Sequence, residues 1–286
     1  MKVAVTGATG FIGRHVVREL ISRGIEVVAT SRAPDPSFAP TEAITYTALD
    51  MDGDATDTFE RLGQPDVLLH LAWGGLPNYR SEIHLISELP KQVAFLRSCV
   101  RSGLKRLVVT GTCLEYGMRS GMLHEKLPAK PCTAYGQAKH QLRRYLQELE
   151  SCNDLQLTWL RLFYLYGSGQ ASTSLYSQLR TAISEGQSEF AMSPGDQLRD
   201  FLPVETAASH ICDIALYNYS TGLLNICSGM PKKLSDLVQE WLRDWRAEIH
   251  LKLGVYPYPD YEPHAFWGSK QKLDSLMAEM QNRHTL

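Results

Sequence analysis

Three glycines at three-residue spacing follow the first apolar run and constrain the fold more than any other feature. The run from Val3 to Val5 predicts a buried strand, and an amphipathic helix is predicted after the glycines. Gly7 allows a tight turn, Gly10 lets a pyrophosphate approach the backbone, and Gly13 lets the helix pack on the sheet. Because a strand precedes the glycines and a helix follows them, the stretch predicts a dinucleotide site. Its predicted contacts are Gly7, Thr9, Gly10, Phe11, Ile12 and Gly13.

Composition narrows the classes of function. With 29 basic and 31 acidic residues among 286, the chain has no charge excess that would favour nucleic acid or a membrane surface. The six cysteines lack metal-type spacing and the nine histidines show no ligand pairing, so we expect reduced thiols and no metal site. No leader is recognised and no apolar run reaches transmembrane length. We therefore expect a soluble cytoplasmic protein.

The second predicted strand, residues 25–30, is followed by Ser31 and Arg32, where dinucleotide folds select their coenzyme. A carboxylate at this point binds the adenosine ribose hydroxyls and repels a 2′-phosphate. A hydroxyl and a guanidinium suit a phosphate better, which favours NADP(H) and leaves NAD(H) as the alternative. In the other interpretation, Arg32 stacks on adenine or extends into solvent. A proline-rich surface loop, Pro34 to Pro40, is predicted next.

The alternation of strands and helices predicts a Rossmann-type, doubly wound parallel α/β sheet. A third strand at 44–49 ends at Asp50 and Met51, whose side-chain and backbone groups can hold adenine. A helix at 90–102 and a fifth strand at 106–110 follow. Such an alternation through residue 150 is typical of parallel sheets with helices on both faces.

A fourth strand, residues 66–72, leads into an aromatic loop. Its apolar density predicts burial, and the loop from Trp73 to Tyr79 then lies at the carboxyl edge of the sheet, where ligands bind in this class of fold. Trp73 and Tyr79 are predicted to line a ligand pocket. Packing of both rings on the core is the alternative.

A second group of residues, Thr112, Tyr135 and Lys139, indicates an enzyme. Tyr135 and Lys139 are four residues apart at the start of a long predicted helix, so they share one face. An ammonium near a phenol favours the phenolate, and we therefore expect a lowered pKa for Tyr135. Thr112 follows the fifth strand, and its hydroxyl can bond a substrate oxygen that Tyr135 protonates or deprotonates.

Together these motifs resemble the extended short-chain dehydrogenase/reductase family of nucleotide-sugar epimerases, dehydratases and ketoreductases. The resemblance covers nearly the whole chain. Further motifs that carry it are His70-Leu71-Ala72, Arg161-Leu162-Phe163, Tyr166 to Gln170, Arg199-Asp200-Phe201 and Asn225 to Gly229. Within the family, the chain is similar to ketoreductases that make dTDP-6-deoxyhexoses such as dTDP-6-deoxytalose or dTDP-fucose.

The resemblance implies roles for individual residues. Tyr135 would be the general acid/base, Lys139 would tune it and hold the nicotinamide ribose, and Thr112 would orient the reacting oxygen. Arg199 would clamp the diphosphate of a nucleotide sugar; an ordinary surface ion pair is the alternative. Further implied cofactor contacts are Leu71, Ala72, Trp73, Thr110, Tyr135, Lys139 and Phe163, and implied substrate contacts are Trp73, Tyr79, Thr112, Tyr164 and Arg199.

Departures from the family pattern narrow the range of reactions expected of this chain. The dehydratases carry Asp-Glu after their threonine, whereas this chain has Cys113 and Leu114, so a dehydratase is not expected. The combined epimerase/reductases place a cysteine where Leu114 stands. Tyr164 replaces a frequent asparagine, and Glu88-Leu89-Pro90 replaces a helix start that often reads Asn-Val.

The C-terminal third is predicted to build a smaller substrate lobe. We expect a dinucleotide domain at 1–163, with returns near 196–228, and a lobe made mainly of 164–286. The predicted helices are 175–185, 203–217 and 233–249, and the predicted strands are 223–227 and 251–255. The aromatic, proline-rich stretch 256–263 suits a rigid loop over a ligand or, equally, a surface contact that holds the C-terminus.

The resulting hypothesis is reduction of the 4-keto group of a nucleotide-diphospho-4-keto-6-deoxyhexose, with a dTDP-sugar favoured. The alternative is a nucleotide-sugar 4-epimerase with tightly bound NAD. A catalytically silent dinucleotide sensor is a third hypothesis, against which the intact Thr112, Tyr135 and Lys139 set argues. The family also implies a homodimer through the helices near 90–102 and 136–150.

Overall fold

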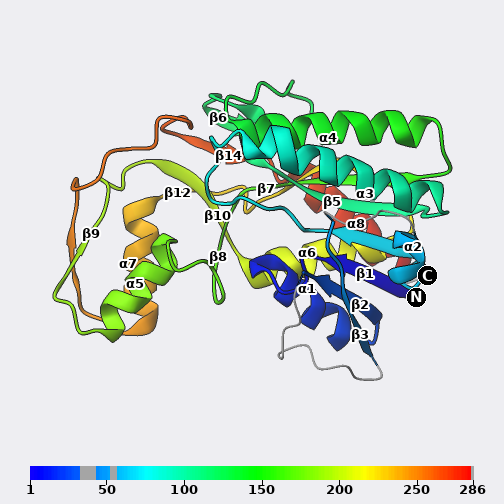
Figure 1. Ribbon diagram of the computed structural model, residues 1–286. Helices are drawn as coiled ribbons and strands as arrows, with labels where there is room; N and C mark the ends of the chain where they lie inside the picture. Colours follow the sequence, from blue (N-terminus) through cyan, green and yellow to red (C-terminus); the bar gives the residue numbers. More distant parts are fainter. Residues whose placement is uncertain (33–42, 52–56, 285–286) are drawn as a thin grey trace.

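The computed structural model describes residues 1–32, 43–51 and 57–284 and has a parallel sheet at its centre (Figure 1). Its seven strands, in order across the sheet, are β3 (Ile44–Ala48), β2 (Glu26–Ser31), β1 (Lys2–Thr6), β4 (Val67–His70), β5 (Arg106–Thr112), β7 (Gln156–Leu162) and β11 (Gly222–Ile226). The strand order reverses between β1 and β4, and ligands bind at such a switch point in open α/β sheets. The predicted Rossmann-type fold is confirmed.

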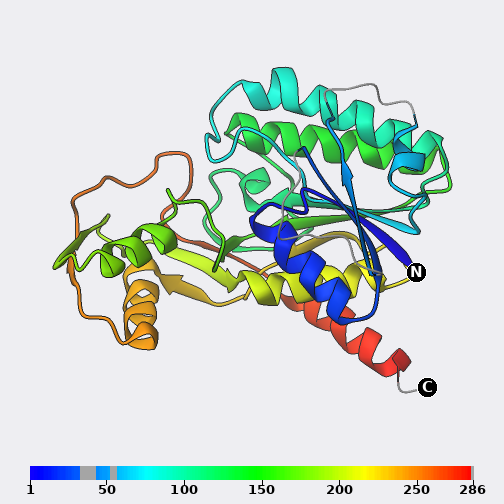
Figure 2. The ribbon, with the colours of Figure 1, turned by 60° about the horizontal axis from the view of Figure 1, so that its bottom comes forward.

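Helices cover both faces of this sheet (Figures 1 and 2). One face packs on α1 (Phe11–Ser22), α6 (Val204–Leu216) and α8 (Gln271–His284), and the other on α3 (Leu89–Arg101) and α4 (Ala134–Ser151). In β1, for example, Val3 and Val5 face the first layer and Ala4 the second. Burial of both faces explains why the central strands read as continuous apolar runs.

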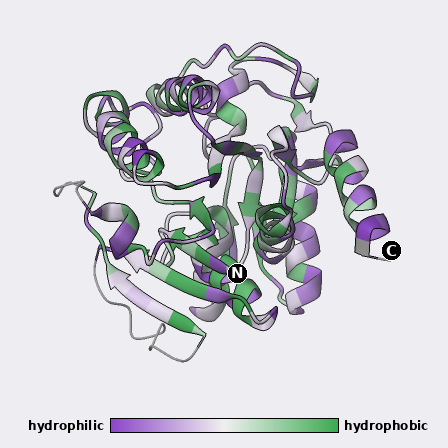
Figure 3. Ribbon diagram, turned by 90° about the vertical axis from the view of Figure 1, so that its right-hand side faces the viewer, coloured by the Kyte–Doolittle hydropathy of each residue, from purple (hydrophilic) through white to green (hydrophobic). Residues whose placement is uncertain are grey.

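The helices themselves are amphipathic, with hydrophilic and hydrophobic residues on each (Figure 3). None of the helices in the described part of the chain has both the length and the apolar character needed to cross a membrane.

The glycine-rich turn holds the start of α1 against the ends of the strands. Gly7 has φ +69°, and a Cβ added there would lie 2.9 Å from the backbone nitrogen of Ala72, beyond the end of β4. A Cβ at Gly13 would lie 2.0 Å from the carbonyl oxygen of Gly7. Only residues without a side chain allow this approach, which brings the N-terminus of α1 to the switch point.

Segments after β7 build a smaller unit beside the sheet. Its short strands and helices are β8 (Tyr164–Tyr166), α5 (Leu175–Ser184), β9 (Glu189–Ala191), β10 (Leu198–Pro203), β12 (Pro231–Lys233), α7 (Leu234–Trp245) and β13 (His250–Lys252). Leu179, Phe190 and Trp241 belong to its own cluster of buried side chains, and α5 and α7 lie away from the sheet in Figure 1. The remaining elements are α2 (Thr58–Arg61), β6 (Gly121–Leu123) and β14 (Phe266–Gly268), of which β6 and β14 pair.

Several predicted boundaries were wrong. The helix expected to reach residue 249 ends at Trp245, because Arg246 adopts a left-handed conformation with φ +52°. The strand expected at 251–255 is β13, which ends before the turn at Gly254, with φ +78°. The fifth strand extends beyond its predicted end to Thr112.

Two features were not predicted, and one predicted loop cannot be compared with the structure. The helix α8 and the pairing of β6 with β14 were not predicted. The predicted loop Pro34 to Pro40 lies outside the described residues.

We expect Gly13→Ala to lower the free energy of unfolding by about 3 kcal/mol, because a methyl group there overlaps backbone that cannot move independently. Gly24→Ala is the matched control. Gly24 has φ +71° but open space around it, so only backbone strain of about 1 kcal/mol is expected. Urea denaturation of the two variants measures the difference. Equal losses of stability would contradict the close helix–strand contact.

Candidate active site

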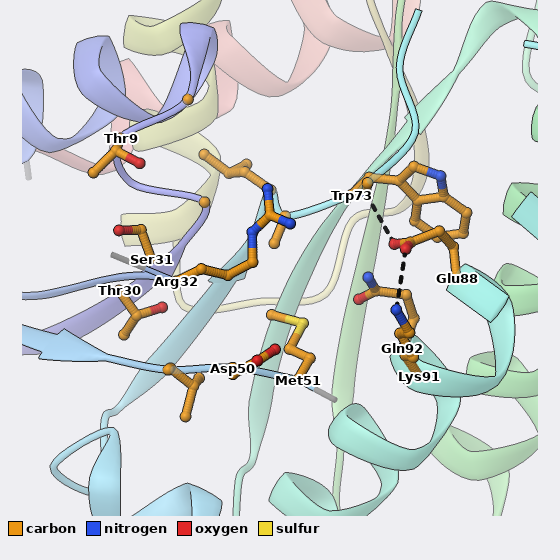
Figure 4. A pocket seen from close by; sticks show the side chains of 16 residues that line it. Thr9, Thr30, Ser31, Arg32, Asp50, Met51, Trp73, Glu88, Lys91 and Gln92 are labelled. Carbon is orange, nitrogen blue, oxygen red and sulfur yellow. Dashed lines mark hydrogen bonds and ion pairs between the residues drawn. The ribbon is translucent and has the colours of Figure 1, made fainter. Parts of the chain in front are cut away.

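A cavity of about 390 Å³ lies over the carboxyl ends of β1, β2 and β4 (Figure 4). The predicted cofactor residues that line it are Gly7, Thr9, Gly10, Ser31, Arg32, Asp50, Met51, Leu71, Ala72 and Trp73. Sequence reasoning missed the lining residues Thr30, Leu49, Gly74, Glu88, Lys91 and Gln92. The unusual helix start Glu88-Leu89-Pro90 was a signal for Glu88, Lys91 and Gln92, because it indicated an altered entry to the cleft.

Other predicted cofactor residues lie elsewhere. Those that do not line this cavity are Phe11, Ile12, Gly13, Thr110, Tyr135, Lys139 and Phe163. Gly13 acts in packing, as described above, and Phe163 is buried beside Phe266 and Tyr116. Tyr135 and Lys139 occupy a neighbouring site that Trp73 links to the cavity.

The cavity has the features that a nicotinamide dinucleotide requires. The α1 N-cap, Gly10, makes no side-chain cap hydrogen bond within the described structure, so the first-turn N–H groups of α1 remain for an anion such as a pyrophosphate. Arg32, Asp50 and Met51 approach the cavity from one side, and Trp73 and Glu88 from the other (Figure 4). Glycine backbone, a helix N-terminus and side chains of both charges therefore fit this cofactor.

Glu88 joins the cavity wall to the loop after β4. Its Oε2 accepts a hydrogen bond from the backbone N–H of Gly74 at 2.9 Å, and its Oε1 lies 3.5 Å from Lys91 Nζ. A Cβ at Gly74 would lie 2.7 Å from this carboxylate, so a larger residue there would require the Glu88 side chain to shift. A π-helical turn, His84–Glu88, precedes α3 and presents Glu88 at this position.

A buried hydrogen-bond network supports the floor of the cavity. His70 is fully buried; its Nδ1 lies 2.9 Å from the Thr6 hydroxyl and its Nε2 2.6 Å from Gln92 Oε1. Burial, with the charge of Lys139, lowers the pKa of His70 to about 3, so the imidazole is neutral. Nε2–H then donates to Gln92 and Nδ1 accepts from Thr6, which ties β1, β4 and α3 together.

Tyr135 and Lys139 are both buried on α4. Lys139 Nζ donates a hydrogen bond to the carbonyl oxygen of Thr110 at 2.8 Å and lies 4.1 Å from the ring centroid of Trp73. The Tyr135 ring is surrounded by Trp73, Tyr79 and His84, with centroids 5.8, 5.7 and 5.2 Å away. The structure therefore brings four predicted site residues together: Trp73, Tyr79, Tyr135 and Lys139. It adds His84, which was not predicted.

The ionisation of Tyr135 and Lys139 differs from the prediction of a lowered Tyr135 pKa. Burial lowers the pKa of Lys139 to about 7 and raises the pKa of Tyr135 above its usual value of about 10. The prediction of a lowered Tyr135 pKa was wrong because the loss of solvation outweighs the nearby ammonium, whose nitrogen is 5.9 Å from the phenol ring centroid. Tyr135 is therefore a protonated phenol at neutral pH, suited to donating a proton.

Thr112 ends β5 and begins a short 3₁₀ turn, Cys113–Tyr116. Its hydroxyl accepts a hydrogen bond from the Leu114 N–H, while its own N–H donates to Glu115 Oε1 at 3.1 Å. Glu115 is fully buried and also binds Trp159 Nε1 and Arg161 Nε, at 2.8 and 3.0 Å. This reciprocal cap positions the threonine.

The start of α4 packs on this turn. A Cβ at Gly136 would lie 2.8 Å from the Leu114 carbonyl oxygen. Tyr135 is therefore held beside the turn that Thr112 begins.

Arg199 and Tyr164 meet at a carboxylate that sequence reasoning missed. Arg199 Nη2 lies 2.8 Å from Glu262 Oε1, and the Tyr164 hydroxyl donates to Glu262 Oε2. Burial raises the pKa of Glu262 to about 7 and lowers that of Arg199 to about 10. The pair is thus buried rather than on the surface, and both groups have lost hydration. Its only sequence signal was the aromatic stretch 256–263, which contains Glu262.

Comparison with known proteins establishes the class. A family model described as "NAD dependent epimerase/dehydratase family" matches residues 3–227. The chain belongs to the NAD-dependent epimerase/dehydratase family, an enzyme family of nucleotide-dependent oxidoreductases and epimerases, as the sequence motifs predicted.

The curated relatives are more specific. A dTDP-6-deoxy-L-talose 4-dehydrogenase (NAD(+)) from Aggregatibacter actinomycetemcomitans is 31% identical over its full length and 94% of this chain. A dTDP-6-deoxy-L-talose 4-dehydrogenase (NAD(P)(+)) from Kitasatospora kifunensis is 27% identical over 97% of this chain and 88% of its own.

Solved structures agree on the fold. A complex of MoeE5 with UDP-glucose and NAD is 25% identical, with a TM-score of 0.81 over 97% of this chain and 92% of that one. A UDP-glucuronic acid 4-epimerase from Bacillus cereus, in complex with UDP-glucuronic acid and NAD, has a TM-score of 0.84 at 21% identity. It covers 97% of this chain and 93% of its own. The resemblance to this second structure concerns the fold alone.

The neutral, buried state of His70 predicts a pH dependence of stability. The folded protein keeps His70 neutral down to a pKa of about 3, whereas the unfolded chain takes up this proton below about pH 6.5. Acidification therefore favours unfolding. Between pH 7 and pH 5, His70 alone should reduce the free energy of unfolding by about 2 kcal/mol.

Denaturant titrations of the wild type and of His70→Asn at both pH values isolate this contribution, because asparagine does not titrate. The stability difference between the two proteins should shrink by about 2 kcal/mol at the lower pH. Parallel losses in both proteins would mean that His70 titrates as an exposed histidine does.

Proposed function

We propose that the protein interconverts a dTDP-6-deoxyhexose and its 4-keto form with a nicotinamide coenzyme, and that it acts as a 4-ketoreductase. The observation that carries the proposal is the position of Tyr135, a buried phenol beside Lys139 and next to the dinucleotide cavity. The choice of sugar is supported by the full-length similarity to the Aggregatibacter 4-dehydrogenase, whose reaction is the reverse oxidation.

Each proposed catalytic residue has a distinct task. When bound, the coenzyme supplies a hydride to C4 of the sugar or removes one from it. Tyr135 donates its phenolic proton to the sugar oxygen as negative charge develops there, and burial keeps that proton in place until it is needed. Thr112 donates a hydrogen bond from its hydroxyl to the same oxygen and orients it, while keeping its proton. Lys139 provides an ammonium that stabilises the phenolate left on Tyr135.

The ionisation of Tyr135 determines which proton transfer it can make at neutral pH. Reduction of a ketone consumes a proton, and a phenol with a raised pKa is a proton donor at neutral pH. Oxidation of an alcohol needs a base, which this phenol becomes only after losing its proton. The form of Tyr135 present at neutral pH is thus the form that ketone reduction requires, and the physiological direction is left to the turnover assay.

We further propose that the cavity accepts NADP(H) as well as NAD(H). Arg32 is exposed at the cavity wall beside Ser31, and a guanidinium there can bind a 2′-phosphate. The printed names of the two 4-dehydrogenases include both coenzymes. A preference for NADP(H), expected from Ser31 and Arg32, remains a prediction. A homodimer through α3 and α4 also remains a proposal.

The second candidate is a 4-epimerase, because a UDP-glucose 4-epimerase from Azospirillum brasilense is 27% identical over 59% of this chain. An epimerase would use the same tyrosine and lysine but would retain NAD and regenerate it in each turnover. Net consumption of coenzyme therefore separates the two functions.

A turnover assay tests the proposal. We expect the 4-keto form of dTDP-6-deoxy-L-talose to be reduced with stoichiometric oxidation of added NADPH or NADH, followed by absorbance and product chromatography. The ratio of kcat/KM for the two coenzymes measures the preference. Conversion of dTDP-6-deoxy-L-talose into its C4 epimer, without added coenzyme, would replace the reductase with the epimerase.

Tyr135→Phe tests the assigned acid. Loss of the phenolic proton should lower kcat at least about 100-fold, since proton transfer typically contributes that much. The affinity for NADH, measured by fluorescence titration, should stay within about threefold, because Tyr135 does not line the cavity. Tyr79→Phe, in the ring that contacts Tyr135, is the matched control and should retain more than a tenth of the activity. Undiminished turnover in Tyr135→Phe would assign the acid elsewhere.

A further inference from the structure

Arg199 of β10, the residue expected to bind the substrate diphosphate, already has a charged partner. Its side chain is almost fully buried; Nη1 donates to the carbonyl oxygens of Leu198 and His264, and Nη2 donates to Glu262. The guanidinium also lies 4.6 Å from the ring centroid of Phe266. An incoming anion that is to bind Nη2 must therefore replace the Glu262 carboxylate.

Glu262 belongs to a segment that has exposed contacts on its outer side and buried contacts on its inner side. We call residues 256–264 the C-terminal strap. Asp260 pairs with Arg80, and Tyr258 donates a hydrogen bond to Asp196, with the side chains in both contacts exposed. Exposed ion pairs stabilise a structure by only about 0–1 kcal/mol each. The strap is thus attached weakly on its outer side.

On its inner side the strap contacts Tyr79, whose ring lies against the proposed catalytic tyrosine. The Tyr261 ring lies 5.8 Å from that of Tyr79, which in turn lies 5.7 Å from the Tyr135 ring. The Tyr261 carbonyl oxygen also accepts a hydrogen bond from Cys132. The same segment therefore contacts both Tyr79, the neighbour of Tyr135, and the guanidinium of Arg199.

We propose that Glu262 is a specificity-determining residue, whose carboxylate stands in for the substrate's anionic group and is exchanged for the diphosphate when a nucleotide sugar binds. This inference rests on the proposed function. A diphosphate brings more oxygens and more negative charge to Arg199 than the carboxylate does, so it compensates for the lost ion pair. A neutral sugar or nucleoside cannot replace the carboxylate, so Glu262 stays on Arg199 and such a ligand gains nothing from the guanidinium. The exchange thereby discriminates against ligands that lack the diphosphate.

Calorimetric titration with dTDP tests the exchange. In Glu262→Gln the competing charge is gone, and the affinity for dTDP should rise roughly tenfold, the size of one charge-assisted hydrogen bond. Thymidine should bind equally to both proteins. In an Arg199→Met background, Glu262→Gln should change dTDP binding less than about twofold, because the group for which both anions compete is absent.

Glu240→Gln is the matched control. Glu240 pairs with Lys232, which lies directly across from Arg199 in the pairing of β10 with β12, so the same charge is removed nearby without touching Arg199. Its dTDP affinity should change less than about twofold. A tenfold gain in this control would mean that general electrostatics, and not exchange at Arg199, controls binding.

One measurement checks that the variants are folded, and one further variant checks that the effect depends on charge. NADH affinity should be unchanged in every variant, since neither Glu262 nor Glu240 lines the dinucleotide cavity. Glu262→Asp, which keeps the charge on a shorter side chain, should give a smaller gain than Glu262→Gln.

The outcomes separate this proposal from the proposed function. If Glu262→Gln binds dTDP no better, or more weakly, while the wild type reduces the 4-keto sugar, then the exchange is wrong and the reductase stands. If the wild type and Glu262→Gln both bind dTDP with undetectable affinity, then the exchange and the proposed substrate class are both wrong.

Discussion

The buried ammonium of Lys139 is the constraint on which the rest of the site depends. A charge with almost no exposure to water is tolerated only when the protein supplies substitutes for hydration. Here β5 contributes the Thr110 carbonyl oxygen, and the loop after β4 contributes the face of Trp73. The contacts of Lys139 thus add to the apolar packing of Leu142 and Leu146 in holding α4 against the sheet.

The same charge reaches the centre of the sheet. Lys139 contributes to the lowered pKa of His70, and a neutral His70 can both accept from Thr6 and donate to Gln92. Through this network the ammonium on α4 is connected to β1, β4 and α3. The dinucleotide cavity and the site of Tyr135 thus share structural supports, although they occupy separate places.

Local patterns predicted the sheet and the glycine-rich turn before α1 well. Strands buried on both faces are apolar throughout, and the glycines that allow α1 to approach Ala72 have no substitutes, so both signals lie in consecutive residues. Tyr135 and Lys139 were found because four residues make one helical turn.

Contacts between distant segments were not predictable in this way. Glu262 reaches Arg199 across 63 positions from a stretch without periodicity, and His70 is hidden inside an apolar strand. The error over the Tyr135 pKa has the same origin. A sequence shows that a lysine is near, but the loss of solvation depends on Trp73, Tyr79 and His84, which only the folded chain brings around the phenol.

The small unit formed by α5, α7, β9 and β13 has its own cluster of buried side chains, and this affects how such enzymes diverge. Because Leu179, Phe190 and Trp241 pack on one another and not on the side chains around Tyr135 and Lys139, substitutions among them are expected to leave that pair in place. Variation within this cluster and variation around Tyr135 and Lys139 can then occur largely independently of each other. Exchange of the cluster as a block between relatives is accordingly expected to preserve the sheet and its buried network.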